Sequence, residues 1–160
     1  DAAIAKQGII NNELLFELEQ NEFFNAPIPK TTGPELFNID YLNNALKCSN
    51  NMHLSKYDVM ATLNKFTANT ITNAIKKSMR NDEFVVYSSG GGMHNPLLMQ
   101  HIQNDFPDIQ FKTTEELRIH PDAKEAVLFA VLANEALCGG STNFGEGIPN
   151  VSMGKISFPK

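Results

Sequence analysis

The order of hydrophobic segments predicts an α/β domain in which helices pack on parallel strands. Two short runs rich in β-branched and aromatic residues, 83–89 and 109–113, alternate with helical patterns, and such alternation is typical of parallel strands joined by right-handed crossovers. Three consecutive glycines, 90–92, follow the first run almost directly. Only two strands are convincing, and a parallel pair leaves its edges and one face unfinished. We therefore expect part of a larger α/β unit.

Length and composition fit a single domain, or one lobe of a larger protein, over residues 1–160. The chain is 42% hydrophobic and 19% charged, and no apolar stretch approaches the roughly 20 residues that a membrane-spanning helix needs. The net charge of −5 gives no broad basic surface for a polyanion. Neither a membrane nor nucleic acid is an expected partner.

The cysteine and histidine content indicates a reducing compartment and no metal centre. Cys48 and Cys138 are too few for a disulfide framework, and neither belongs to a CxxC pair or a Cys/His cluster. The four histidines do not stand at metal-ligand spacing. We expect a cytoplasmic protein in which this chain holds no metal.

The first expected element is a short amphipathic helix over 12–19, NELLFELE, capped by Asn11 or Asn12. Prolines at positions 27, 29 and 34 then interrupt the chain. We expect a loop over 25–54 that either wraps the main core or marks a minor domain boundary.

A long helix is expected to begin near Ser55. Ser55 and Asp58 form a plausible capping box, and apolar side chains recur after them at helical spacing to about Met79. The run EFVVYSS, 83–89, follows without polar alternation until its end. It predicts a strand that is covered on both faces.

The second half of the chain is expected to form a helix, a strand and another helix. Asn95 and Pro96 supply an N-cap and a first-turn proline for a helix to about Asp105, and 109–113 is the next strand. Pro121 opens the last helix, whose apolar residues nearly surround it. We expect that helix to be buried and to end at Gly139 and Gly140. The glycine-rich stretch 139–150 is expected to be a surface loop, with a ligand-gating role as the alternative.

The three glycines lie where open α/β sheets bind ligands, at the carboxyl end of a strand and before a helix. Free N–H groups and the helix dipole favour an anion there, and glycine lets a phosphate or a nucleoside approach the backbone. We expect Gly90, Gly91 and Gly92 to contact such a ligand, and His94 beside them to touch it. The alternative is that the glycines allow a helix and a strand to pack closely. The run matches neither the dinucleotide-binding fingerprint nor the P-loop.

Two acids stand three residues apart at the start of the last helix. Asp122 and Glu125 share one face near the helix N-terminus, where a carboxylate is electrostatically favoured. They are either capping acids or groups that bind a substrate. Glu125 is flanked by apolar residues, so at a layer boundary it must find a donor or a ligand.

Four stretches, taken in order and spacing, resemble the carboxyl-terminal half of the anhydro-N-acetylmuramic acid kinase family. They are PKTTGPELFN (29–38), DVMATLNKFTANTI (58–71), SGGGMHNPLLM (89–99) and HPDAKEAVLFAVLA (120–133). Together with AAIAKQG near the start and IPNVSMG near the end, they cover almost the whole chain.

The resemblance implies an RNase H-like lobe of the actin, hexokinase and Hsp70 type, one of two lobes that close over a cleft. Such kinases add water across the 1,6-anhydro bond of the sugar. With Mg²⁺, they transfer the γ-phosphate of ATP to O6, which yields N-acetylmuramic acid 6-phosphate in cell-wall peptidoglycan recycling. The family's glycine run contacts the nucleotide, which implies that residues 90–92 and Asn95 lie against ATP. The residue that matches Glu125 belongs to the sugar-side cleft, and Asp122 lies beside it.

Two features of the family have no counterpart in this sequence: the amino-terminal phosphate loop, and the Asp-Thr-Gly-Pro-Gly-Asn motif with its general base. Both are expected before Asp1, so no catalytic residue is expected in this chain, and Mg²⁺ is expected to be held mainly by the absent amino-terminal lobe. Phosphoryl transfer depends on such groups, so the chain alone is not expected to turn over substrate. The alternative is a free-standing nucleotide-binding or regulatory module. A homodimer is left open.

Overall fold

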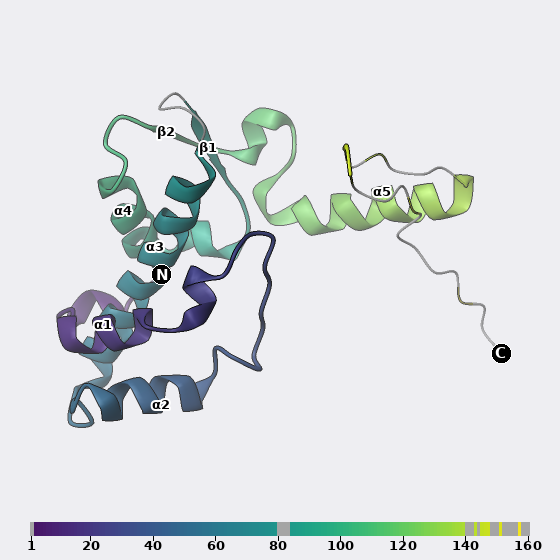
Figure 1. Cartoon of the computed structure of the whole chain (residues 1–160). Coiled ribbons are helices and arrows are strands. Elements are labelled where there is room, and N and C mark those ends of the chain that lie inside the picture. The colour runs from purple at the N-terminus through teal and green to yellow at the C-terminus, as the bar shows by residue number, and fades with distance from the viewer. Residues whose placement is uncertain are drawn as a thin grey trace. The chain divides into compact units, whose positions relative to one another are not determined.

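Residues 2–79, 84–139, 143, 145–147, 151 and 157 are described by a computed structural model (Figure 1). The chain divides into two units. The first comprises Asp1–Val86 and Gly92–Phe111, and the second comprises Tyr87–Gly91 and Lys112–Lys160. Within the described residues, no helix is both long enough and apolar enough to cross a lipid bilayer.

Helix α1, Asn12–Glu19, confirms the first predicted element. Its N-cap is Asn11, whose side-chain oxygen accepts a hydrogen bond from the backbone N–H of Leu14 at 2.8 Å. Leu14 and Leu18 stand one helical turn apart and are completely buried. This spacing places both leucines on one face, which packs against Ala45.

Helix α2, Ile39–Cys48, lies inside the segment 25–54 for which we expected a loop, so that prediction is wrong for residues 39–48. The side-chain oxygen of Asn38 caps the helix by accepting from the N–H of Tyr41 at 3.0 Å. The apolar face of α2 packs on α1. Residues 26–38 form no helix or strand, as the prolines predicted.

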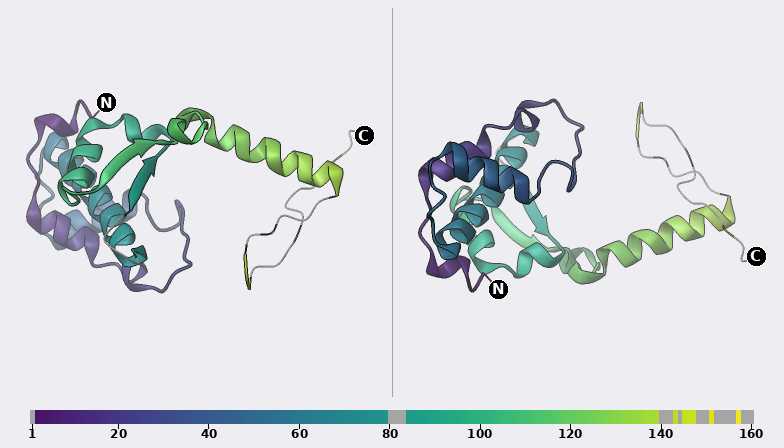
Figure 2. Two further views of the ribbon diagram at one scale, coloured as in Figure 1. Left: turned by 90° about the horizontal axis from the view of Figure 1, so that it is seen from above. Right: turned by 90° about the horizontal axis from the view of Figure 1, so that it is seen from below.

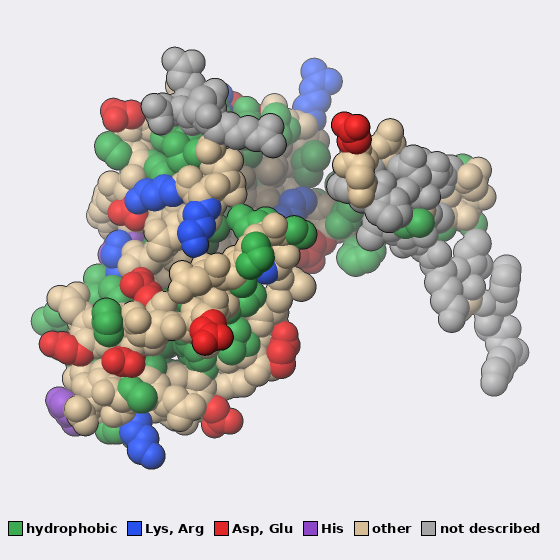
Figure 3. Space-filling view, viewed as in Figure 1, with side chains coloured by type: hydrophobic (Ala, Val, Ile, Leu, Met, Phe, Trp, Pro, Cys, Tyr) green, Lys and Arg blue, Asp and Glu red, His purple; other side chains and the backbone are tan. Residues whose placement is uncertain are grey.

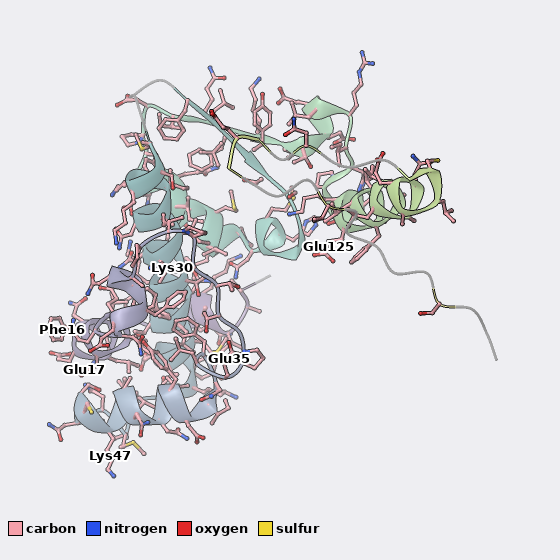
Figure 4. The ribbon with its side chains drawn as sticks, turned by 45° about the vertical axis from the view of Figure 1, so that its right-hand side comes forward. Phe16, Glu17, Lys30, Glu35, Lys47 and Glu125 are labelled. Atoms are coloured by element: carbon pink, nitrogen blue, oxygen red, sulfur yellow. The ribbon has the colours of Figure 1, made fainter. Side chains whose placement is uncertain are left out.

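Aromatic side chains pack the proline-rich segment onto the rest of the first unit. Phe23 and Phe24, in the 3-10 helix η2 (Glu22–Asn25), join Phe37, Tyr41 and Phe66 in a chain of ring contacts with centroids 5.1–6.4 Å apart. Lys30, labelled in Figure 4, donates to the carbonyl of Phe23, and its ammonium lies 4.7 Å from the centre of that ring. Elsewhere on the face of this unit shown in Figure 3, acidic and basic side chains are interspersed.

Helix α3, Lys56–Ser78, begins and ends where the sequence predicts. The hydroxyl of Ser55 accepts from the N–H of Asp58 at 3.2 Å and donates to its carboxylate at 2.8 Å, which confirms the capping interaction. The other carboxylate oxygen of Asp58 accepts the backbone N–H of Ile9 at 2.8 Å. The carboxylate of Asp58 therefore supports the Ser55 cap of α3 and also holds the amino-terminal segment against the helix.

Small side chains on α3 allow neighbouring elements to approach closely. The 3-10 helix η1, Ala5–Gln7, and helix α4, Pro96–Asn104, both pack on α3. Next to η1, a Cβ added to Gly8 would lie 2.0 Å from the carbonyl oxygen of Tyr57, so only glycine fits there. The side chains of α3 that are at most 3% exposed are all small: Ala61, Thr62, Ala68 and Thr72.

Strands β1, Val85–Ser88, and β2, Gln110–Thr113, pair in parallel and confirm the mixed helix and strand order (Figure 2). The chain crosses from one strand to the other through α4. In the first unit, Leu98 and Ile102 of α4 form a core with Ala68 and Phe106. Partly buried residues of α3 surround this core, together with Phe111 of β2 and the residues just before the two strands, Phe84 and Ile109.

Strand β1 is not covered on both faces, so that expectation is wrong. Val85 and Tyr87 are each 40% exposed, and the residues that alternate with them are less exposed. The described residues supply covering side chains for only one face of the strand. The same residues form a sheet of two strands, as the sequence predicted.

Helix α5, Lys124–Cys138, lies in the second unit and was expected to be buried, but none of its residues is. Phe129 is 67% exposed and Leu137 is 75% exposed. Its main packing partner among the described elements is the 3-10 helix η5, Pro121–Ala123. Gly139, with φ of +71°, ends the helix as predicted. Gly140 and most of the expected loop 139–150 lie outside the described residues.

We predict that Asp58 contributes to the pH dependence of stability. Its pKa lies below the ordinary value because the N–H of Ile9 and then the hydroxyl of Ser55 donate to the carboxylate. A pKa that is lower in the folded than in the unfolded state stabilises the fold above the unfolded value. That contribution is lost as the pH falls through the folded value. Asp58→Asn should therefore flatten the acid limb of the unfolding free energy measured by urea denaturation.

The matched control is Asp40→Asn. Asp40 is an exposed acid in the first turn of α2, so its replacement should leave the acid limb close to that of the wild type. Equal slopes for the two variants would contradict the role of Asp58.

Candidate functional site

Residues 90–92, which we call the glycine corner, follow β1 after one intervening serine. Gly90 has φ of +82°, in the region that side chains rarely adopt. Its N–H donates to the carbonyl oxygen of Pro121 at 3.1 Å, a bond within the second unit. The backbone conformation therefore explains why position 90 is glycine.

Gly91 and Gly92 have no comparable explanation within the described residues. A Cβ on Gly91 would meet no atom within 4 Å, and one on Gly92 would meet only the Leu98 side chain, at 3.9 Å. Neither glycine has a positive φ. The alternative that glycine permits close packing of a helix on a strand is therefore not supported. The described structure leaves space beside the backbone at these positions.

The chain leaves the glycine corner through a 3-10 helix, η3 (Gly91–His94), and enters α4. Asn95 is the N-cap, as predicted, and its side-chain oxygen accepts from the N–H of Leu98 at 3.0 Å. Pro96 is the first helical residue. His94 is exposed beside this cap. The first turn of α4 leaves the N–H of Leu97 without a helical partner and carries the positive end of a dipole, both of which favour an anion.

A pocket of about 460 Å³ opens in the first unit next to Asn95, within the range of roughly 300–1,000 Å³ common for small-molecule sites. We call it the α3 pocket. Its remaining walls come from the amino-terminal residues 2–5 and from one face of α3: Met60, Leu63, Asn64 and Thr67. No pattern in the sequence predicts this pocket. The spacing i, i+3, i+4, i+7 marks these four residues as one helix face, but it does not show what that face meets.

The acids proposed for a substrate lie in the second unit. Asp122 is an exposed residue of η5 whose backbone N–H donates to His120 at 3.3 Å. Glu125, labelled in Figure 4, is exposed in the first turn of α5, and its side chain has no hydrogen bond or ion pair in the described structure. The expectation of one buried helix from Pro121 is wrong, because α5 begins at Lys124 and is exposed.

The hydrogen bond from Gly90 to Pro121 joins two of the predicted site segments inside the second unit. It fixes the start of the glycine corner beside the residue that precedes Asp122. Gly92, His94 and Asn95 belong to the first unit, as does the α3 pocket.

These features define an α/β protein in which a run of glycines separates a strand from a capped helix. The family model described as anhydro-N-acetylmuramic acid kinase matches residues 1–153. The chain belongs to the anhydro-N-acetylmuramic acid kinase family.

Three relatives, each named anhydro-N-acetylmuramic acid kinase, show how much of such a protein this chain represents. The identity is 54% with the protein of Pseudoalteromonas atlantica, 53% with that of Pseudoalteromonas translucida and 38% with that of Caldanaerobacter subterraneus. Each comparison covers 99% of this chain and 41% of the relative. The chain thus spans less than half the length of these relatives.

Alanine substitutions should separate the two kinds of glycine in the corner. We expect Gly90→Ala to destabilise the fold by about 1–2 kcal/mol, because a Cβ is strained at its positive φ. Gly91→Ala should change the unfolding free energy by less than about 0.5 kcal/mol, since the added methyl group meets no atom. Urea denaturation measures both values. Similar costs at the two positions would contradict this account of the corner.

Proposed function

We propose that this chain is part of an ATP-dependent kinase that converts 1,6-anhydro-N-acetylmuramic acid to N-acetylmuramic acid 6-phosphate in peptidoglycan recycling. The observation that carries the proposal is the glycine corner in a chain of this family. Gly91 and Gly92 have no positive φ and no close neighbour. Their missing side chains therefore leave room for a group from outside the chain, and ATP is the ligand that a kinase requires.

The nucleotide is held by the backbone of residues 90–92, together with His94 and Asn95. Asn95 caps α4 by accepting from the N–H of Leu98, and Pro96 has no N–H, so the N–H of Leu97 is the donor that the first turn leaves for a ligand. A phosphate of ATP is favoured at this helix terminus by that N–H and by the dipole. The described residues therefore suit ATP in two ways: the backbone at Gly91 and Gly92 has space beside it, and the start of α4 favours an anion.

Glu125 and Asp122 bind the sugar. Both side chains are exposed, and Glu125 has no partner in the described structure. A carboxylate can accept hydrogen bonds from sugar hydroxyl and amide groups. We assign these acids to orienting the substrate, because the chemical step needs a general base and phosphate-binding groups for which this sequence has no matching motif.

The chain forms an RNase H-like lobe that is completed by another part of the kinase, the amino-terminal lobe. Three observations support this: β1 has a face that is not covered, α5 has no buried residue, and the chain spans 41% of its relatives. Among the described residues, no group of three His, Cys, Asp or Glu side chains is placed to hold a metal ion. We assign Mg²⁺ mainly to the amino-terminal lobe.

Gly91→Val tests the nucleotide site. The chain alone should bind ATP weakly, since it holds only part of the site. Gly91→Val should remove that binding while leaving the melting temperature unchanged, because the side chain enters open space. Calorimetric titration and thermal melting measure the two properties.

Ala74→Val, at an exposed position of α3, is the control for introducing a β-branched side chain elsewhere. Unchanged ATP affinity in Gly91→Val would overturn the assignment of the glycine corner. Loss of stability without loss of binding would support a packing role instead.

Phe129→Asp tests whether α5 packs against the rest of the kinase. Phe129 is 67% exposed, so the chain alone should change in stability by less than about 0.5 kcal/mol. The chain can be co-expressed with the part of the Pseudoalteromonas atlantica relative that lies outside the matched 41%. In that experiment, Phe129→Asp should prevent the two parts from co-purifying and should abolish phosphoryl transfer from ATP to the anhydro sugar.

Met52→Asp is the matched control, because Met52 is 66% exposed but lies in the first unit, and it should assemble normally. Normal assembly of Phe129→Asp would contradict the role of α5. A wild-type complex that binds ATP without transferring phosphate would favour the regulatory-module alternative.

A further inference from the structure

The α3 pocket has the chemistry of a site for a flat, uncharged ring. The described residues that line it are all uncharged, and its exposed surface is mainly apolar. Residues 2, 3 and 5 are alanines, whose small side chains leave room for a planar group against the backbone. A phosphate would find no cation here, so the part of a nucleotide that suits this pocket is its base.

Three side chains that line the α3 pocket are polar, and the oxygens of two of them already take part in hydrogen bonds within the protein. The hydroxyl of Thr67 donates to the carbonyl of Leu63 at 2.9 Å, and the oxygen of Asn95 accepts the N–H of Leu98 at 3.0 Å. The side-chain oxygen of Asn64 is buried and has no hydrogen-bond partner among the described residues. A buried acceptor without a donor is unfavourable, so Asn64 is the polar group of this pocket that gains most from a ligand.

We propose that Asn64 selects adenine over 6-oxo purines by pairing with the edge of the base in the α3 pocket. The inference rests on the nucleotide site proposed above, because Asn95 borders both that site and this pocket. A carboxamide offers one acceptor and one type of donor, which match the N6 amine and the N7 acceptor of adenine. A 6-oxo purine presents two acceptors along the same edge, so the carboxamide oxygen finds no donor.

The geometry of Asn64 allows this pairing at small cost. Its oxygen is turned away from solvent but holds no hydrogen bond, so rotation of the carboxamide about χ2 towards a ligand breaks none. Asn64 also stands on α3 one turn from Met60, on the face that lines the pocket. The helix therefore fixes the distance between the Asn64 carboxamide, which would contact the base, and the apolar Met60 side chain.

The test compares ATP with ITP, which differ at the six position of the purine, in binding to the 160-residue chain. The wild type should prefer ATP. Asn64→Ala should weaken ATP binding about tenfold, as expected for loss of a bidentate base contact, and should change ITP binding less than twofold. Asn73→Ala, an exposed asparagine of the same helix outside the pocket, should behave as the wild type. Competition titrations measure all three preferences.

Asn64→Leu, which keeps the side-chain size, replaces Asn64→Ala if the alanine variant melts at a lower temperature. An ATP-to-ITP preference that equals the wild-type value in a folded Asn64 variant would overturn the inference and leave the nucleotide site standing. A wild-type chain that binds neither nucleotide would overturn the proposed nucleotide site, and the inference with it.

Discussion

The packing of helix α3 is the constraint on which the first unit depends. Its amino-terminal half supplies Leu63 and Phe66 to the cluster around α1 and α2, and its carboxyl-terminal half supplies Ala68 and Ile71 to the core beneath α4 and the strands. One helix therefore joins two cores that share no buried residue. Because its own buried side chains are small, its neighbours approach its backbone closely, and larger residues there would separate both cores at once.

The start of α3 also determines where the site residues lie. Asp58 links the helix cap to Ile9, and Gly8 permits the contact with Tyr57. These interactions hold the amino-terminal segment against α3, where residues 2–5 form one wall of the α3 pocket. At the other end of the unit, α4 packs on α3 and brings Asn95 to the same pocket. The pocket is thus a consequence of helix packing and does not depend on a specialised loop.

Local sequence signals predicted the elements that have strong caps and failed where burial depends on distant parts of the chain. Asn11, Ser55 and Asn95 each cap the helix that the sequence assigned to them. Helix α2 escaped prediction because the prolines before it dominate the local pattern, while its apolar face is defined only by contact with α1. The burial of α5 was predicted wrongly because an apolar helix identifies a need for cover without showing that the same chain provides it.

The candidate site, like the fold, could be predicted from the sequence only in part. The glycine corner is visible in the sequence, but the sequence cannot distinguish Gly90, which is required by its φ, from Gly91, which has open space beside it. Gly8 has less room for a side chain than any other glycine in the described structure. It is a single glycine outside any motif, so the sequence gives no sign of this constraint. Asn64 could not be recognised from sequence, since its significance arises from an unpaired oxygen and from a wall about sixty residues distant along the chain.

The exposed apolar residues of α5 affect how the chain would behave in a cell on its own. Four apolar side chains of α5 are each more than 40% exposed: Val127, Leu128, Phe129 and Val131. Exposed apolar surface promotes aggregation and is one reason why chaperones exist. Under the two-lobe proposal made above, a single polypeptide that encodes both lobes would remove that hazard, because each new copy would carry its own cover for α5 at a high local concentration.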